Sequence, residues 1–497
     1  MILLCLVAIW LAGFGLVRWM FPQPVGWSLH NTFLFSLGIG TGAGIASSIY
    51  FLALEFAGPS RTVLASATGA AVLIALALGF LTRRKGAGFS MAEGPPLPRY
   101  LTLMFAAAAV LALIMFLSAV LYNQHGDEAA WSIWNLRARF LFRSGPDWRV
   151  AFSHDLAWTH LDYPLLLPGL VAMCWKLSGA ESTAAPVAIA FLFGLGTVGV
   201  LMSTLAVLRG KMQALLGGTL LLGTASFIAL DASLYGDVPL SFYILATLAL
   251  VYLQDRNPQD LRFTVLAGLM AGFAAWTRNE GLIFVVAVLI GRVIALARAP
   301  NKSQNRTAIL PQLLGWLAGL AAPLAVVILF KLRVAPPSEY LSVPGSVILK
   351  HLADWGRWIT VIQGLLTVLI TFGRFVLPVA LVLGLYAYLV RFRPEYSGGG
   401  ESGERASLAT VWVALPLTLG LQLLIDLLYD ANLGLEINTS LERILLQLWP
   451  AMVLAFFAAA NSPQLVALKT PSRKAKTAPK RAKAKAAGSS RSVAETR

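Results

Sequence analysis

The sequence predicts an all-α, polytopic membrane protein with about 13 transmembrane helices, and three observations lead to this fold class. Hydrophobic residues make up 58% of the 497-residue chain, charged residues make up 12%, and the mean hydropathy is +0.73. A soluble domain carries roughly twice that charged fraction, about 25%. Many apolar runs reach the ~20 residues that a helix needs to cross the hydrocarbon layer. These runs lack the alternation of β-barrel strands, which excludes an outer-membrane barrel.

The first apolar run, residues 1–17, has neither a basic n-region nor a small-residue cleavage site, so we expect a retained helix and not a signal peptide. Segments 165–178 and 346–366 are short or interrupted, and we expect re-entrant or interfacial helices on the outer side. Continuous apolar runs predict the remaining spans at 31–56, 62–82, 100–121, 186–208, 213–231, 238–253, 263–276, 282–298, 310–333, 372–391, 407–428 and 443–460.

The distribution of Lys and Arg predicts the orientation of the chain in a plasma (bacterial inner) membrane. Basic residues are concentrated in the connections 82–99, 209–211, 256–262, 298–306 and 391–406, which we therefore place inside. The outer side then receives the connections and segments 122–185, 235–239, 277–281, 334–371 and 429–443. We expect any active site on this periplasmic or extracellular face.

The net charge of +16 is unevenly distributed along the chain. Ten of the 39 basic residues and one of the 23 acidic residues lie in 462–497, a segment rich in Ala, Lys, Pro and Ser. This composition predicts a disordered, solvated cytoplasmic tail, with contact to anionic lipid headgroups as an alternative. The charge therefore gives no indication of nucleic-acid binding.

We divide the chain into an accessory bundle (1–99), a catalytic core (100–300) with an outer loop at 122–185, a C-terminal transmembrane region (301–461) and the tail (462–497). No clear internal repeat is visible. The two cysteines, Cys5 and Cys174, both lie in apolar runs and predict neither a disulfide framework nor a Cys-based metal site.

The loop 122–185 is the longest polar interval between apolar spans, and it opens with two adjacent acids, Asp127 and Glu128. Adjacent carboxylates at the membrane boundary repel each other and suit one of them to act as a general base. The alternative is helix capping, because Gly-Asp-Glu before an apolar helix is good N-terminal chemistry.

The helix that follows these acids carries Trp131 and Trp134 together with Arg137, Arg139 and Arg143. Aromatic and basic side chains on one helix are typical of the membrane interface. We expect the arginines to be anchored among lipid headgroups, or alternatively to bind a lipid phosphate.

The loop closes with Asp162-Tyr163-Pro164, which could hydrogen-bond sugar hydroxyls or form a plain turn. His125, His154 and His160 each lie within two residues of an aspartate. A divalent cation is one reading of these pairs, although their spacing matches no standard metal signature, and ordinary interfacial histidines are the other.

Three charged residues interrupt apolar sequence with almost no loop around them, namely Asp237, Arg278 and Glu280, and Arg443 is a further outer-side candidate for binding phosphate. Ionisable groups at such depth are expensive and are usually functional or paired. The planar donor fork of arginine suits a phosphate. A purely structural Arg278–Asp237 pair is the alternative.

Four strings in this order carry a family resemblance: GDEAAWSIWNLRA (126–138), HLDYPLLLP (160–168), YGDVPLSF (235–242) and WTRNEG (276–281). Over roughly residues 100–300 the chain resembles the GT-C superfamily of polyprenyl-phosphate-sugar-dependent glycosyltransferases. Its members include the protein O-mannosyltransferases, the aminoarabinose transferases and bacterial lipopolysaccharide glycosyltransferases.

The resemblance implies an enzyme that moves a sugar from a polyprenyl-phosphate donor to an envelope glycan, lipid or protein, with inversion at the anomeric carbon. It implies Asp127 as the general base with Glu128 beside it. From the residues themselves we expect substrate contacts at Asp162, Tyr163, Asp237, Arg278, Glu280 and Arg443, the last of which lies outside the region of resemblance. The family's helix after the loop often opens with His-Pro-Pro, where this chain has Asp162-Tyr163-Pro164.

Two other functions compete with a transferase. A transporter or flippase for lipid-linked sugars or other anions would also use intramembrane Arg and Asp, although such proteins are commonly built from repeats. A non-catalytic anchoring protein would be indifferent to Asp127→Asn.

Overall fold

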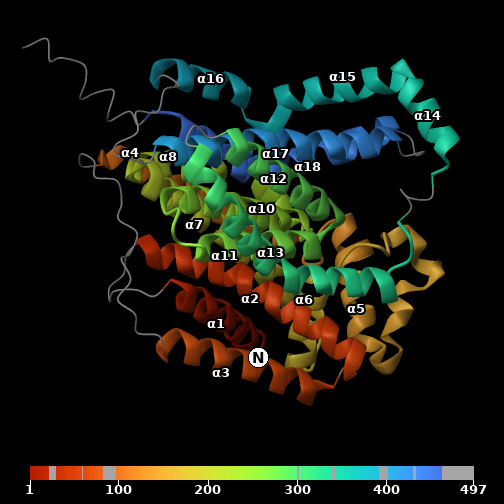
Figure 1. Cartoon of the computed structure of the whole chain (residues 1–497). Coiled ribbons are helices and arrows are strands. Elements are labelled where there is room, and N and C mark those ends of the chain that lie inside the picture. The colour runs from red at the N-terminus through yellow and green to blue at the C-terminus, as the bar shows by residue number, and fades with distance from the viewer. Residues whose placement is uncertain are drawn as a thin grey trace, which may run out of the picture.

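The computed structural model describes residues 1–21, 29–58, 60–81, 97–298, 302–338, 343–375, 377–390, 401–428 and 433–461. All regular structure in these ranges is helical (Figure 1). The elements are α1 (Ile2–Met20), α2 (Leu29–Phe56), α3 (Arg61–Leu81), α4 (Arg99–Tyr122), η1 (Ala130–Trp134), α5 (Asn135–Arg143), η2 (Gly145–Phe152), η3 (His154–Thr159), α6 (Leu166–Ser178), α7 (Ala184–Arg209), α8 (Lys211–Leu222), α9 (Ala225–Ala232), α10 (Asp237–Arg256), α11 (Arg262–Thr277), α12 (Asn279–Arg298), α13 (Lys302–Arg333), α14 (Gly345–Ala353), α15 (Trp355–Thr371), η5 (Phe372–Arg374), α16 (Val379–Val390), α17 (Glu401–Leu428) and α18 (Leu433–Ala459).

The chain is a multi-pass, all-α membrane protein. Within the described residues, 11 helices are long and apolar enough to cross a membrane, or 12 if the bent pair α8 and α9 forms one span. The predicted count of 13 is not confirmed, and the predicted span at 263–276 is α11, which has 16 residues. Helix α6 has only 13 residues, fewer than the helices that are long enough to cross a membrane, and the re-entrant or interfacial placement of segment 165–178 stays a prediction.

The prediction of an outer interfacial helix at 346–366 is not confirmed, because most of this segment belongs to a helix long and apolar enough to cross a membrane. Helix α15 is apolar enough to span, and it lies along α18 with Gly364 against Ile437. Gly373 and Arg374 then adopt positive φ values of 76° and 55°, which ends the helix. The predicted span 372–391 is therefore only the 12-residue helix α16, which follows α15 along the edge of the bundle (Figure 1).

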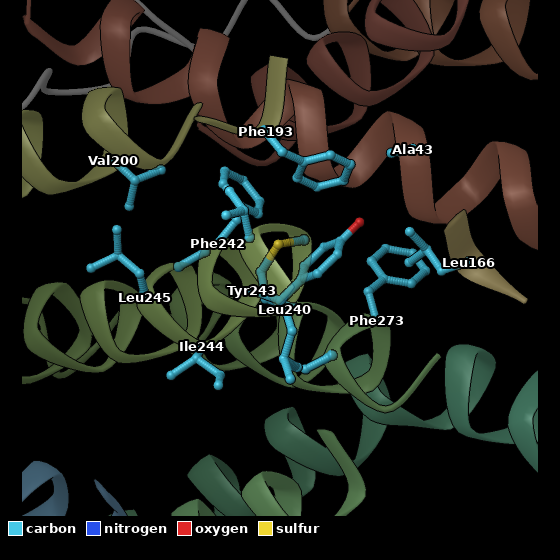
Figure 2. Packing of buried hydrophobic residues seen from close by; sticks show 14 of the residues in the cluster. Ala43, Leu166, Phe193, Val200, Leu240, Phe242, Tyr243, Ile244, Leu245 and Phe273 are labelled. Carbon is cyan, nitrogen blue, oxygen red and sulfur yellow. The ribbon is translucent and has the colours of Figure 1, made fainter. Parts of the chain in front are cut away.

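Helix α10 is the centre of the bundle, with every residue of its apolar window buried. It packs against α2, α7, α11 and α18. Figure 2 shows Tyr243 of α10 between Phe193 and Phe273, with its hydroxyl directed toward α2. That hydroxyl donates to the Gly40 carbonyl oxygen at 2.8 Å, which satisfies the one polar atom of this side chain.

The segment from residue 123 to 165, which includes α5, lies at one end of the bundle (Figure 1). We call this end the loop end. Glu55, at the last turn of α2, fastens this end. It accepts from Arg149 of η2 at 2.6 Å and from Arg333 of α13 at 2.9 Å. The loop is therefore held to two transmembrane helices.

Several predicted connections lie outside the described residues: most of 82–99, residues 391–400, residues 429–432 and the tail 462–497. Their placement on one or the other side of the membrane stays a prediction. The hydrophobic core draws residues from all three predicted transmembrane regions, from Cys5 to Ala458.

Candidate functional site

A cavity of about 700 Å³ opens at the loop end of the bundle. It is formed by the ends of five long helices and by the turn that precedes α6. Six of the eight residues assigned to the site from the sequence line it, namely Asp162, Tyr163, Asp237, Arg278, Glu280 and Arg443. They come from four separate stretches of the chain.

Asp237 is fully buried at the first position of α10 and accepts hydrogen bonds from three side chains. Arg278 and Arg443 donate to its Oδ2 at 2.9 Å each, and Gln447 donates to its Oδ1 at 2.7 Å. Two cations and an amide compensate one buried carboxylate, which is what burial of a charge requires. Asp237 therefore connects the start of α10 to the junction of α11 and α12 and to α18.

Arg278 is 6% exposed, and its guanidinium donates hydrogen bonds to two carboxylates. Besides Asp237 it donates to Glu280, and its guanidinium lies over the rings of Trp134 and Tyr163 at 5.7 and 5.3 Å. The predicted structural pair with Asp237 is thus present, and Arg278 contributes to the wall of the cavity as part of a network.

Arg443 is the more accessible arginine, with 32% of its side chain exposed. It shares Asp237 with Arg278, and its guanidinium lies 4.8 Å from the centre of the Tyr235 ring. Its Nε atom is buried without a hydrogen-bond partner. The exposed part of its side chain lines the cavity, where Arg443 can meet an anion.

Lys331, near the end of α13, is a third cation in the cavity wall, and it was not among the site residues predicted from the sequence. It donates to the Asp162 carbonyl oxygen and to Asn279 Oδ1, the latter at 2.8 Å. The Asp162 carboxylate accepts from Asn279 Nδ2 at 2.7 Å and lies 3.7 Å from the Lys331 ammonium. These contacts fix the Asp162 turn against α12 and α13.

Arg137 determines the shape of that turn. It is 2% exposed and donates to the carbonyl oxygens of Thr159, His160 and Tyr163 at 2.9–3.3 Å. Burial lowers the pKa of Arg137 to about 10, so the side chain stays charged at neutral pH. The prediction of a lipid-facing role is wrong for Arg137, because the chain folds back over it.

Arg139 and Arg143 do face outward, and both approach Glu181, Arg143 at 2.8 Å. The hydrogen bond from Arg143 holds the pKa of Glu181 below its usual range. This pairing links α5 to the connection before α7.

Tyr163 is enclosed by other rings. Trp134, in the π-helical turn η1, stacks on it at 5.7 Å between ring centres, and His160 stacks on it at 5.0 Å. Burial raises the pKa of Tyr163 well above its usual value, so its phenol is neutral and remains a hydrogen-bond donor. His160 has a φ of 52°, which turns the chain toward Asp162.

Asp127 and Glu128 do not line the cavity. Both are exposed, and Asp127 accepts from Ser233 Oγ at 2.6 Å and from Asn123 Nδ2 at 3.1 Å. Gly126 has a φ of 76° and lies so close to the Ser233 carbonyl oxygen that a Cβ would be 2.6 Å from it. Asp127 is thus fixed at the start of the η1–α5 helix, the position that the capping alternative gives it. Its role as a base stays a prediction.

In the described part of the chain, no group of three or more His, Cys, Asp or Glu side chains could hold a metal ion. His125 instead lies 3.2 Å from Arg139 Nη2 through its Nδ1. The divalent cation that the His–Asp pairs left open has no supporting geometry in these residues.

Several buried polar atoms of the cavity wall have no hydrogen-bond partner in the protein: Glu280 Oε2, both amide atoms of Gln422, Asp426 Oδ2 and Gln447 Oε1. An unsatisfied buried polar atom costs about 1–3 kcal/mol, so such groups need a bound partner. The sequence signal for Gln422, Asp426 and Gln447 was polar residues inside apolar runs, and it was not used.

Comparison of the chain with protein-family models, with curated proteins and with solved structures finds no match.

Proposed function

We propose that this protein is a membrane glycosyltransferase that takes a sugar from a polyprenyl-phosphate donor and passes it to an envelope glycan, lipid or protein. One observation carries the proposal. Residues that the sequence marked from four separate stretches, between Asp162 and Arg443, converge on a single cavity at the loop end. Charged groups that converge in a pocket of this size favour a ligand site.

The wall of the cavity fits the parts of such a donor. Arg443 and Lys331 offer cationic donors to a phosphate. The unpartnered oxygens and amide atoms of Glu280, Gln422 and Gln447 offer acceptors and donors to sugar hydroxyls. Ile133, Leu282, Ile283 and Ile444 supply apolar wall for the first prenyl units. Arg278, held by Asp237 and Glu280, positions this wall.

In this reading, Arg443 stabilises the charge that develops on the departing phosphate, while the acceptor attacks the anomeric carbon from the opposite side. The sugar is then transferred with inversion. The proposed setting is a plasma membrane with the loop end on the outer face and the C-terminus in the cytoplasm, as the Lys and Arg distribution predicts.

Mass spectrometry of envelope glycans and lipids tests the proposal in cells with and without the gene. We expect one sugar substituent to disappear on deletion and to return with the wild-type chain. Unchanged glycans, lipids and proteins would contradict a transferase.

A second arm separates an enzyme from a flippase, because a flippase acts only across a sealed bilayer. Purified protein in detergent, given an envelope extract as the source of lipid-linked donor and acceptor, should transfer the sugar. If the substituent depends on the gene in cells but never forms in detergent, the transporter alternative is favoured.

A further inference from the structure

We infer, resting on the function proposed above, that Gln422 and Asp426 of α17 form the acceptor subsite and that Asp426 receives the proton of the attacking hydroxyl or amine. Two independent observations support this inference. Polar atoms of Gln422 and Asp426 are buried without a hydrogen-bond partner, and the other carboxylates near the cavity are bonded to protein groups or are more exposed.

Gln422 and Asp426 lie four residues apart on α17 and therefore on one face of that helix. Both line the cavity, and they are only 3% and 8% exposed. Neither the amide nitrogen nor the amide oxygen of Gln422 has a partner, and Asp426 Oδ2 has none. Three unsatisfied buried atoms on one helix face are costly unless a ligand occupies them.

The other carboxylates of the cavity wall that the sequence assigned to the site are held by groups of the protein, although Glu280 Oε2 has no partner. Asp237 accepts from two arginines and an amide, and Asp162 accepts from Asn279 beside Lys331. Glu280 is bound to Arg278 through Oε1. A carboxylate held by a cation is a poorer proton acceptor than one without it.

Asp127 lies outside the cavity with both oxygens bonded. Glu436, in the first turn of α18, lines the cavity but is more exposed. Among the cavity carboxylates in the described residues, Asp426 thus combines deep burial with an Oδ2 atom that has no hydrogen-bond partner in the protein.

The two side chains fit an acceptor substrate that both donates and accepts hydrogen bonds, such as a polyol or an amino alcohol. The Gln422 amide can donate to one oxygen and accept from its neighbour, while Asp426 Oδ2 accepts from the reacting O–H or N–H. In the transfer step, the acceptor oxygen or nitrogen forms a bond to the anomeric carbon. The bond from that carbon to the phosphate oxygen breaks, the phosphate leaves with the electron pair, and the proton passes to Asp426.

The test compares Asp426→Asn, Asp127→Asn and, as a matched control, Asp354→Asn in a deletion strain. Asp354 is exposed and caps α15 by accepting from Gly356 N at 2.8 Å, away from the cavity. Transfer is followed by mass spectrometry of the envelope and by the detergent assay. Binding of polyprenyl phosphate alone is followed by the rise in unfolding temperature of each purified variant.

We expect Asp426→Asn to bind polyprenyl phosphate as the wild type does, and to lose about 10²- to 10⁴-fold in transfer rate, the usual effect of removing a general base. Gln422→Leu should raise the acceptor concentration needed for half-maximal rate, with donor binding unchanged. Asp354→Asn should transfer at a near wild-type rate, and Asp127→Asn is compared with Asp426→Asn to decide which carboxylate acts as the base.

Near wild-type transfer by Asp426→Asn would overturn the inference, and loss confined to Asp127→Asn would move the role of base to the loop. If Asp426→Asn does not fold, Gln422→Leu decides, because an unchanged acceptor dependence removes the subsite. Failure of the proposed function looks different, since the wild-type gene would then restore no sugar to the deletion strain.

Discussion

Arg278 and Arg443 share the Oδ2 atom of Asp237, yet they differ in what else they touch. Arg278 is enclosed by Glu280 and two aromatic rings, and Arg443 is one-third exposed toward the cavity. The first geometry stabilises the fold, and the second leaves a cation for a ligand. The two arginines should therefore separate in stability and binding measurements.

Arg278→Ala should lower the free energy of unfolding by about 3–5 kcal/mol, because it leaves Asp237 and Glu280 buried with less compensation. Arg278→Lys should recover part of the loss, since the charge remains but the donor fork does not. Thermal unfolding of purified protein in detergent measures this. A wild-type unfolding temperature in Arg278→Ala would contradict the network described here.

Arg443→Gln should keep most of the stability, because Arg278 and Gln447 still hold Asp237. It should weaken polyprenyl-phosphate binding by about tenfold or more, since one charge-assisted contact contributes about 1.5–3 kcal/mol. Titration of polyprenyl phosphate against the unfolding temperature measures the difference. Equal affinity in Arg443→Gln and wild type would remove the phosphate role.

For single residues, the sequence identified as site residues those charged side chains that lie inside apolar runs. Asp237, Arg278 and Glu280 interrupt apolar runs, so their depth alone marked them. Arg137 was misread, because an amphipathic pattern does not reveal that the chain later folds back over one face. Asp426 escaped notice, because nothing in a long apolar run shows which face of its helix meets a cavity.

Among the helices, α11 and α13 pack closely through paired glycines. The strings GLMAG (268–272) and GWLAG (315–319) face each other. A Cβ at Gly268 would lie 2.2 Å from the Trp316 carbonyl oxygen, and one at Gly319 would lie 1.8 Å from the Val265 carbonyl oxygen. Small residues at such spacing let helix backbones pack directly in a membrane.

Gly319→Leu should therefore force α13 away from α11 and lower the unfolding temperature markedly. Gly384→Leu is the matched control, because nothing lies within 4 Å of the position a Cβ would take there. Both variants are compared by thermal unfolding in the same detergent. Similar unfolding temperatures for the two would refute the close packing.

Helices α1 and α6 approach each other at the only two cysteines of the chain. Both are buried, and the Cys5 and Cys174 Sγ atoms lie 3.6 Å apart. A disulfide needs about 2.05 Å between its sulfurs, so a shift of roughly 1.5 Å is enough. Iodine should oxidise the pair to an intramolecular disulfide, detected as linked peptides by mass spectrometry. Recovery of both thiols by alkylation after unfolding would contradict this contact.

The elements were predicted best where a long apolar run had clear ends, as in α2, α4 and α7. The helix boundaries predicted within 346–391 were misplaced, because Asp354, Gly373 and Pro378 together determine where these helices begin and end. The Asp354 side chain caps the start of α15. Positive φ values at Gly373 and Arg374 end the helical stretch that follows. There, Phe372 packs on Trp449 near the middle of α18.

Across the whole molecule, the arginines of two predicted inner connections, 209–211 and 256–262, gather at the end of the bundle opposite the cavity. Arg209 donates to the Ala458 carbonyl oxygen at 2.8 Å, Arg256 to the Val207 carbonyl oxygen at 2.9 Å and Arg262 to the Met20 carbonyl oxygen at 2.6 Å. These connections therefore lie at the end of the bundle away from the loop, and their placement on the inner side stays a prediction. Which end faces the cytoplasm follows from the positive-inside rule.

Sidedness decides which substrates the cavity can meet, because a lipid-linked sugar is presented on one face of the bilayer at a time. We expect a cysteine at Asp155, which is exposed at the loop end, to react in intact cells with a membrane-impermeant maleimide. A cysteine at Ser490, in the basic tail, should react only after the cells are opened. The background carries Cys5→Ala and Cys174→Ala, so that each variant holds one thiol. Labelling of Ser490→Cys but not Asp155→Cys in intact cells would invert the topology and place the cavity, with its donor, at the cytoplasmic face.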